Sequence, residues 1–156
     1  LAEIDGRLGQ LRHRLRALPE HARITELQAR RKVVDDLCRD ARIVVDDLTR
    51  DQRKSEQDVE QVRTRRERDQ SRMDQGLITN PKDLERMSHE LTSLERRINE
   101  LEDVELEIMA RLEDAQRDLD QHTSELREVD DELEAATINR DRNSEEIRAQ
   151  LVEVEA

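Results

Sequence analysis

Apolar residues recur along most of the chain at alternating steps of three and four positions. An average spacing of about 3.5 residues keeps such side chains on one seam of a left-handed supercoil of α-helices. Two such stripes are present, so the pattern predicts two long helices that pair along a narrow seam. The first stripe comprises Ile24, Leu27, Arg31, Val34, Cys38, Ala41, Val45, Leu48, Gln52, Ser55, Val59, Val62, Arg66, Asp69 and Met73. The second comprises Leu84, Met87, Leu91, Leu94, Ile98, Leu101, Glu105, Ile108, Leu112, Ala115, Leu119, His122, Leu126, Val129, Leu133, Ala136, Arg140, Asn143, Ile147 and Gln150.

The two stripes are mirror images about Asn80. Val59, for example, lies as far before Asn80 as Leu101 lies after it. The turn signals of the chain fall at the same place, because Gly76 can adopt positive φ and Pro81 suits the first position of a returning helix. We therefore expect an all-α fold, a long antiparallel two-helix coiled-coil hairpin, with helices of roughly 75–110 Å at the ~1.5 Å rise per residue of an α-helix.

A short N-terminal helical segment precedes the hairpin. Its stripe is out of phase with the seam that begins at Ile24, and Pro19 stands at the break. Proline inside a helix removes a backbone hydrogen bond and clashes with the preceding turn, so a kink or a separate helix is expected. The stripe of this segment comprises Leu1, Ile4, Leu8, Leu11, Leu15 and Leu18. The expected organisation is a helical segment over residues 1–18, long helices over residues 20–75 and 82–156, and a turn over residues 76–81.

The open end of the hairpin carries polar residues in the second stripe, Arg140 and Asn143. We expect the pairing of the two long helices to be weakest there, since apolar contacts are missing. The leucine-rich segment 1–18 then has three alternatives: it packs as a third strand of the coiled coil, contacts another subunit, or contacts a part of the protein beyond Ala156. The chain begins without Met and stops in mid-pattern, so we interpret it as a piece of a longer protein.

Composition agrees with a rod rather than a globule. The chain has no Phe, Tyr or Trp, 44% of its residues are charged, and only 33% are hydrophobic. A two-helix rod buries only its seam, so this composition is expected of it. Low hydrophobicity with a net charge of -12 is also typical of disordered chains. Two Pro, three Gly and an unbroken heptad phase favour the helix instead.

Charge is distributed unevenly along the chain. Residues 99–134 hold fifteen acidic residues against three arginines, a flank that would repel nucleic-acid phosphates. A basic cluster near the turn breaks the trend. One interpretation gives these arginines acidic partners across the seam; the other makes them contacts to RNA or DNA, although no aromatic residue offers a stacking platform. The candidate nucleic-acid contacts are Arg63, Arg65, Arg66, Arg68 and Arg72.

No constellation of catalytic residues is found, and we expect no enzyme activity. The chain has no phosphate-binding glycine-rich loop, no Cys-x-x-Cys pair and no His-Glu-x-x-His motif. Cys38 and His122 fall in one seam layer, but two ligands are too few for a structural zinc. We therefore expect no catalytic, cofactor-binding or metal-binding residue in this chain.

Polar seam residues near the middle of the hairpin leave two interpretations open. Ser55 mirrors Glu105, and Gln52 mirrors Ile108, so apolar packing is replaced in two neighbouring layers. A buried polar layer costs stability but can fix the register of a coiled coil. Alternatively, these layers form a loosened, hydrated stretch of the seam.

Several short stretches after the turn resemble one bacterial family. They are Asn80-Pro81-Lys82-Asp83, His89-Glu90-Leu91, Ser93-Leu94, Arg96-Arg97, Leu101-Glu102-Asp103 and Glu107-Ile108-Met109. The sequence resembles the coiled-coil hairpin of bacterial proteins with a C-terminal C4-type zinc ribbon. The resemblance implies a zinc ribbon held by four cysteines, none of which is in this chain. It also implies a non-enzymatic adaptor or chaperone, in some relatives linked to flagellar regulation through a transcription factor or RNA.

The turn is the first candidate for a partner-binding site, since apolar residues without seam partners are rimmed there by basic ones. These residues are Leu77, Ile78, Asn80, Lys82 and Arg86. We expect a protein partner. The alternatives are an RNA- or DNA-binding module that uses the basic tip with the missing ribbon, and the coiled-coil arm of a larger enzyme such as an ATPase or a tRNA synthetase.

The chain shows no signal peptide and no apolar run of the ~20 residues that span a bilayer, and it has a single Cys. We expect a cytoplasmic protein that does not bind membranes. Apolar stripes pair between chains as readily as within one, so a monomeric hairpin and a homodimer with exchanged helices both remain open.

Overall fold

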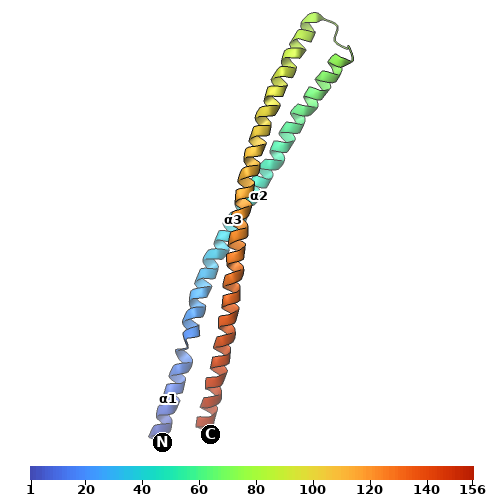
Figure 1. Cartoon of the computed structure of the whole chain (residues 1–156). Helices are drawn as coiled ribbons and strands as arrows, with labels where there is room; N and C mark the ends of the chain where they lie inside the picture. The colour runs from blue at the N-terminus through green and yellow to red at the C-terminus, as the bar shows by residue number, and fades with distance from the viewer. The chain divides into compact units, whose positions relative to one another are not determined.

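The computed structural model describes all 156 residues and contains three α-helices and no strand. They are α1 (Ala2–Arg16), α2 (Pro19–Asp74) and α3 (Pro81–Glu155), and Figure 1 shows them in order along the chain. Both long helices begin at a proline, which suits the first helical position because its missing N–H would have no partner there. The predicted all-α antiparallel hairpin is confirmed.

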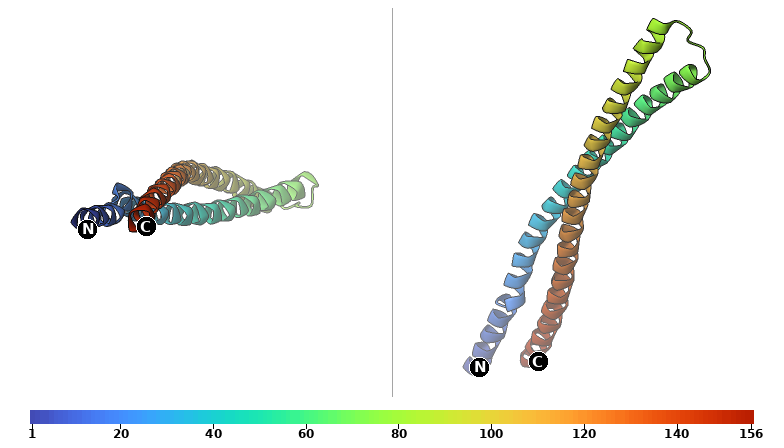
Figure 2. Two further views of the ribbon diagram at one scale, coloured as in Figure 1. Left: turned by 90° about the horizontal axis from the view of Figure 1, so that it is seen from below. Right: turned by 45° about the horizontal axis from the view of Figure 1, so that its top comes forward.

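The chain divides into two compact units. The first comprises residues 1–40 and 120–156, and the second comprises residues 41–119. Within each unit α2 lies antiparallel to α3, as both views of Figure 2 show. The first unit contains α1 and both chain ends, whereas the second contains the turn.

The seam follows the predicted stripes. Every position of both stripes is buried or half-buried, including the polar members. Leu27 and Val129 are 1% and 0% exposed in the first unit, and Val59 is 1% exposed in the second. Side chains between the stripes are mostly exposed, so the core is one residue layer deep along each unit. The spacing of apolar residues therefore located the core correctly.

Cross-helix ion pairs fix the same register. In the first unit Arg31 donates a hydrogen bond to Asp130 at 2.6 Å. In the second, Arg66 donates one to Glu95. The members of each pair lie at almost equal distances in sequence from Asn80. The hydrogen bond to Asp130, reinforced by its negative charge, raises the pKa of the Arg31 guanidinium above its ordinary value.

The N-terminal segment packs within the chain. Leu11, Leu18 and Ile147 form a buried cluster, so α1 lies against the last turns of α3, as Figure 2 shows. The segment does not pack as a third strand, because its leucines contact only the end of α3 and continue the two-helix pairing before the break at Pro19. Leu1 and Ile4 are exposed, and Arg12 contacts Glu155 at 3.3 Å near the end of α3. The apolar residues packed around this cluster are Leu15, Leu151 and Val154.

A polar layer separates this cluster from the next one along the seam. Asn143 donates a hydrogen bond to Glu20 at 2.7 Å, whereas Ile24, Leu27 and Ala136 form the next apolar cluster. Polar seam residues therefore do occupy the open end, as the sequence indicated. The sequence predicted weak pairing of the long helices at this end. The leucines of α1 supply apolar contacts that the polar layer lacks, and these contacts compensate for it.

Candidate functional site at the hairpin turn

The C-terminus of α2 is closed by two backbone hydrogen bonds. The N–H of Leu77 bonds the carbonyl of Arg72 at 3.2 Å, and the N–H of Gly76 bonds that of Met73 at 3.1 Å. Gly76 has φ +68°, the left-handed conformation that glycine adopts without a steric cost. This is a Schellman motif, which satisfies carbonyls that the helix itself leaves without partners.

Asn80 begins the returning helix. Its side-chain oxygen accepts a hydrogen bond from the N–H of Lys82 at 3.0 Å, and its carbonyl accepts from the N–H groups of Asp83 and Leu84. An asparagine that accepts in this way caps a helix N-terminus, and Pro81 follows at the first helical position. Asn80, which the sequence placed among the partner-binding candidates, thus has a local structural role.

The apolar candidates of the turn lie differently. Leu77, the residue that follows Gly76 in the Schellman motif, is 64% exposed. Ile78 is half-buried and lines a groove of about 320 Å³ between the turn and both helices. The other lining residues are Arg72, Asp83, Arg86, Met87 and Glu90. The turn therefore presents one exposed leucine beside a groove with an apolar floor and a charged rim.

Three of the five arginines proposed as nucleic-acid contacts bond to glutamates across the seam. Arg63 bonds Glu102, which raises the pKa of its guanidinium through the hydrogen bond. Arg65 bonds Glu90, and Arg66 bonds Glu95. These pairs match the interpretation of cross-seam partners, and they leave less positive charge free at the tip. The sequence analysis missed Glu90, although its spacing of four residues from Arg86 places both on one helix face.

The remaining basic candidates are open to solvent. Arg68, Arg72 and Lys82 are exposed and make no ion pair. Arg86 approaches Asp83 at 3.7 Å, with its side chain 80% exposed. The positive charge available to a partner at the turn is therefore carried by Arg68, Arg72, Lys82 and Arg86.

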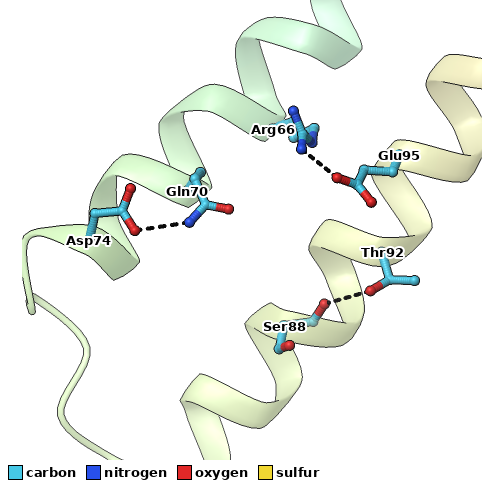
Figure 3. A network of polar contacts seen from close by, with 6 residues as sticks. All are labelled: Arg66, Gln70, Asp74, Ser88, Thr92 and Glu95. Carbon is cyan, nitrogen blue, oxygen red and sulfur yellow. Dashed lines mark hydrogen bonds and ion pairs between the residues drawn. The ribbon is translucent and has the colours of Figure 1, made fainter.

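Near the turn, polar contacts hold each helix to itself and to its neighbour, as Figure 3 shows. Gln70 donates to Asp74 at 2.9 Å along α2, and only Arg66 reaches across to Glu95 among the residues drawn. A groove of about 800 Å³ runs beside them from Arg63 to Gln75. Asp69 is only 6% exposed in this stretch of the seam. The pairing close to the turn is thus more polar than at Val59.

Two further residues, Cys38 and His122, are assigned to one seam layer by the sequence. Cys38 is a buried free thiol in the first unit, and His122 in the same unit lies 3.6 Å from Glu125. No group of three or more His, Cys, Asp or Glu side chains is placed to hold a metal ion. None of the three helices has a stretch both long and apolar enough to cross a bilayer.

The whole chain, residues 1–156, matches the family described as the CT398-like coiled coil hairpin domain, and it belongs to that family. It is 33% identical over 127 residues to the uncharacterized proteins MT2288 and Rv2229c of Mycobacterium tuberculosis strains CDC 1551 and H37Rv. These matches cover 81% of this chain and 50% of each relative. The chain thus spans about half the length of the curated relatives it matches.

A solved structure from Mycobacterium smegmatis has the same fold. It matches with a TM-score of 0.84 at 29% identity, over 98% of this chain and 63% of that chain. Bacterial relatives and a shared hairpin agree with the coiled-coil hairpin part of the resemblance found in the sequence. Membership of this family indicates a structural or protein-interaction module.

Proposed function

We propose that this hairpin is a non-enzymatic adaptor module that presents its turn to a protein partner. The observation that carries the proposal is the exposure of Leu77, which is apolar, 64% exposed and adjacent to the groove that Ile78 lines. Together with Ile78 and Met87 of that groove, Leu77 offers a partner an apolar patch rimmed by charged residues, which is a common feature of binding sites. The Schellman motif and the Asn80 cap support the proposal, because they hold the turn in one conformation and lower the entropy cost of binding.

We also propose that the hairpin belongs to a longer protein in which a zinc ribbon follows it. This protein would have a regulatory or chaperone-like role in the cytoplasm. The resemblance of residues 80–109 supports it, as does the half-length coverage of the mycobacterial relatives. A buried reduced thiol, Cys38, suits that compartment. Metal analysis of the full-length protein tests this part: about one bound zinc per chain is expected, and none would overturn it.

Site-specific photo-crosslinking in cells tests the turn. A photoreactive amino acid replaces Leu77 in one strain and Leu106 in another, because Leu106 is 61% exposed but lies on α3 away from the turn. We expect discrete adducts with protein at position 77, lost when Ile78→Ser is added, and none at position 106. Equal labelling at both positions, or none at position 77, would contradict an adaptor that binds through its turn.

RNA or DNA binding remains a second candidate, favoured by the unpaired positive charge of Arg68, Arg72 and Lys82. It predicts affinity that falls steeply with salt. Binding of a mixed RNA and DNA pool across a salt series should then be lost in the triple variant Arg68→Gln, Arg72→Gln, Lys82→Gln. This variant leaves the cross-helix pairs of Arg63, Arg65 and Arg66 intact, so a loss of binding would not reflect a damaged hairpin.

A further inference from the structure

A third groove lies between α2 and α3 in the unit of residues 41–119, well away from the turn in sequence. Its volume is about 460 Å³, and its apolar lining consists of Val44, Leu48 and Ala115. Val44 is 48% exposed, although it is a large apolar residue. Ala115 is a seam residue without a long side chain to fill the space above it. The groove thus offers an apolar strip that this chain leaves uncovered.

Acidic residues line both sides of this strip. Asp47 and Asp51 stand four residues apart on α2, and Asp114 and Asp118 stand four apart on α3. At the ~1.5 Å rise of an α-helix, each pair is about 6 Å apart along its axis. The groove is therefore an apolar strip between two parallel rows of carboxylates.

Little within the chain neutralises these carboxylates. Asp51 and Asp118 make no ion pair. Asp47 and Asp114 contact Arg50 and Arg117 of their own helices at 3.5 Å and 3.3 Å, in pairs that are more than 60% exposed and contribute little energy. The one basic lining residue, Arg111, donates a hydrogen bond to Glu107 at 2.9 Å.

We propose that this groove docks a basic amphipathic helix of another protein, which adds a third helix to the coiled coil. Such a helix places apolar residues at steps of three and four on the strip, and Lys or Arg residues four apart opposite each row of aspartates. The negative charge of the groove favours such a helix over a nucleic acid or a second copy of this chain. A nucleic acid would be repelled by the four aspartates, and a second copy of this chain brings a net charge of -12. The site is separate from the turn and does not rest on the function proposed above.

The test uses the whole chain and a designed probe. The probe is an amidated helical peptide of about 18 residues with a leucine stripe flanked by lysines four apart; the control peptide has glutamate in place of each lysine. Fluorescence anisotropy should show saturable binding of the lysine peptide only. Asp51→Asn with Asp118→Asn should weaken binding about fivefold, and adding Val44→Ser should weaken it further.

A matched variant separates docking from general charge attraction. Glu128→Gln with Asp131→Asn removes the same charge from exposed positions of α3 outside the groove, and it should leave the affinity unchanged. An equal loss of affinity in both double variants would overturn the proposal, as would equal binding of the glutamate peptide. Self-association of the chain that Val44→Ser abolishes would also overturn it, because the occupant would then be a second copy. Circular dichroism of each variant checks that the helices are retained.

Discussion

The imidazole of His21 donates a hydrogen bond from Nε2 to the backbone carbonyl of Leu15, with 3.1 Å between the two atoms. This carbonyl lies four residues before Pro19, and proline has no N–H to bond it. The side chain of His21 therefore replaces the backbone donor that the helix break removes. The sequence analysis found no role for His21, although a histidine two residues after a helix-breaking proline was the available signal.

Replacing His21 with alanine should destabilise the junction of α1 and α2. The carbonyl of Leu15 would lose its donor, so we expect His21→Ala to lower the free energy of unfolding by about 1 kcal/mol. Urea unfolding followed by circular dichroism measures the change. The control is His89→Ala, because the side chain of His89 is 80% exposed and lies 3.9 Å from Glu85. Similar losses in the two variants would contradict a structural role for His21.

Truncation of Leu27 tests how much the single-layer seam contributes to stability. Leu27 is 1% exposed, and removal of a buried leucine side chain forfeits its transfer energy and leaves a cavity. We expect Leu27→Ala to lower the free energy of unfolding by about 2–3 kcal/mol. The same change at Leu106, which is 61% exposed, should cost about 0.5 kcal/mol or less. Urea titrations of both variants would refute the seam assignment if the two losses were equal.

The same substitution at two glycines should have opposite effects. Gly76 has φ +68°, so Gly76→Ala should destabilise the turn by about 1–2 kcal/mol even though nothing within 4 Å would clash with the new Cβ. Gly9 lies inside α1 with no positive φ and open space around it. Gly9→Ala should therefore raise the free energy of unfolding by about 0.5–1 kcal/mol. Thermal unfolding of the two variants should shift the midpoint in opposite directions.

Ser55 allows a choice between the two interpretations of the polar seam. Its hydroxyl is buried and has no hydrogen-bond partner. If it only fixes the register, Ser55→Ala should raise the free energy of unfolding by about 1 kcal/mol beyond the change in helix propensity. The control is Ser93→Ala, at an exposed position of α3, because it changes the free energy of unfolding only through the higher helix propensity of alanine. A lower stability of Ser55→Ala than of Ser93→Ala would instead indicate a hydrated layer that uses the hydroxyl.

Much of the fold could be predicted because the seam repeats. The mirror of Val59 and Leu101 about Asn80 coincides with the turn signals Gly76 and Pro81. Together they fix direction and register, since a shift by one heptad would move the turn away from these two residues. The position of α1 could not be predicted in this way. Its stripe is short, and its partner Ile147 stands among polar seam residues that weaken the pattern, so three alternatives were equally compatible with the sequence.

The candidate sites were less predictable, because they depend on residues outside the seam. The sequence indicated that the arginines near the turn have partners across the seam, but not that Arg63, Arg65 and Arg66 have them while Arg68 does not. The groove at Val44 was not found at all. Its lining combines the two helices, and a pattern read along one helix does not reveal which outer positions of the other lie beside it.

The cross-helix contacts also imply an order of folding. Arg65 and Glu90 are separated by 25 residues along the chain, whereas Arg12 and Glu155 are separated by 143. Closing the longer loop first would cost about 1.5 kcal/mol more in chain entropy. Pairing should therefore start near the turn and zip toward the termini, so that α1 docks last and a chain emerging from the ribosome cannot form its seam until it has passed Asn80.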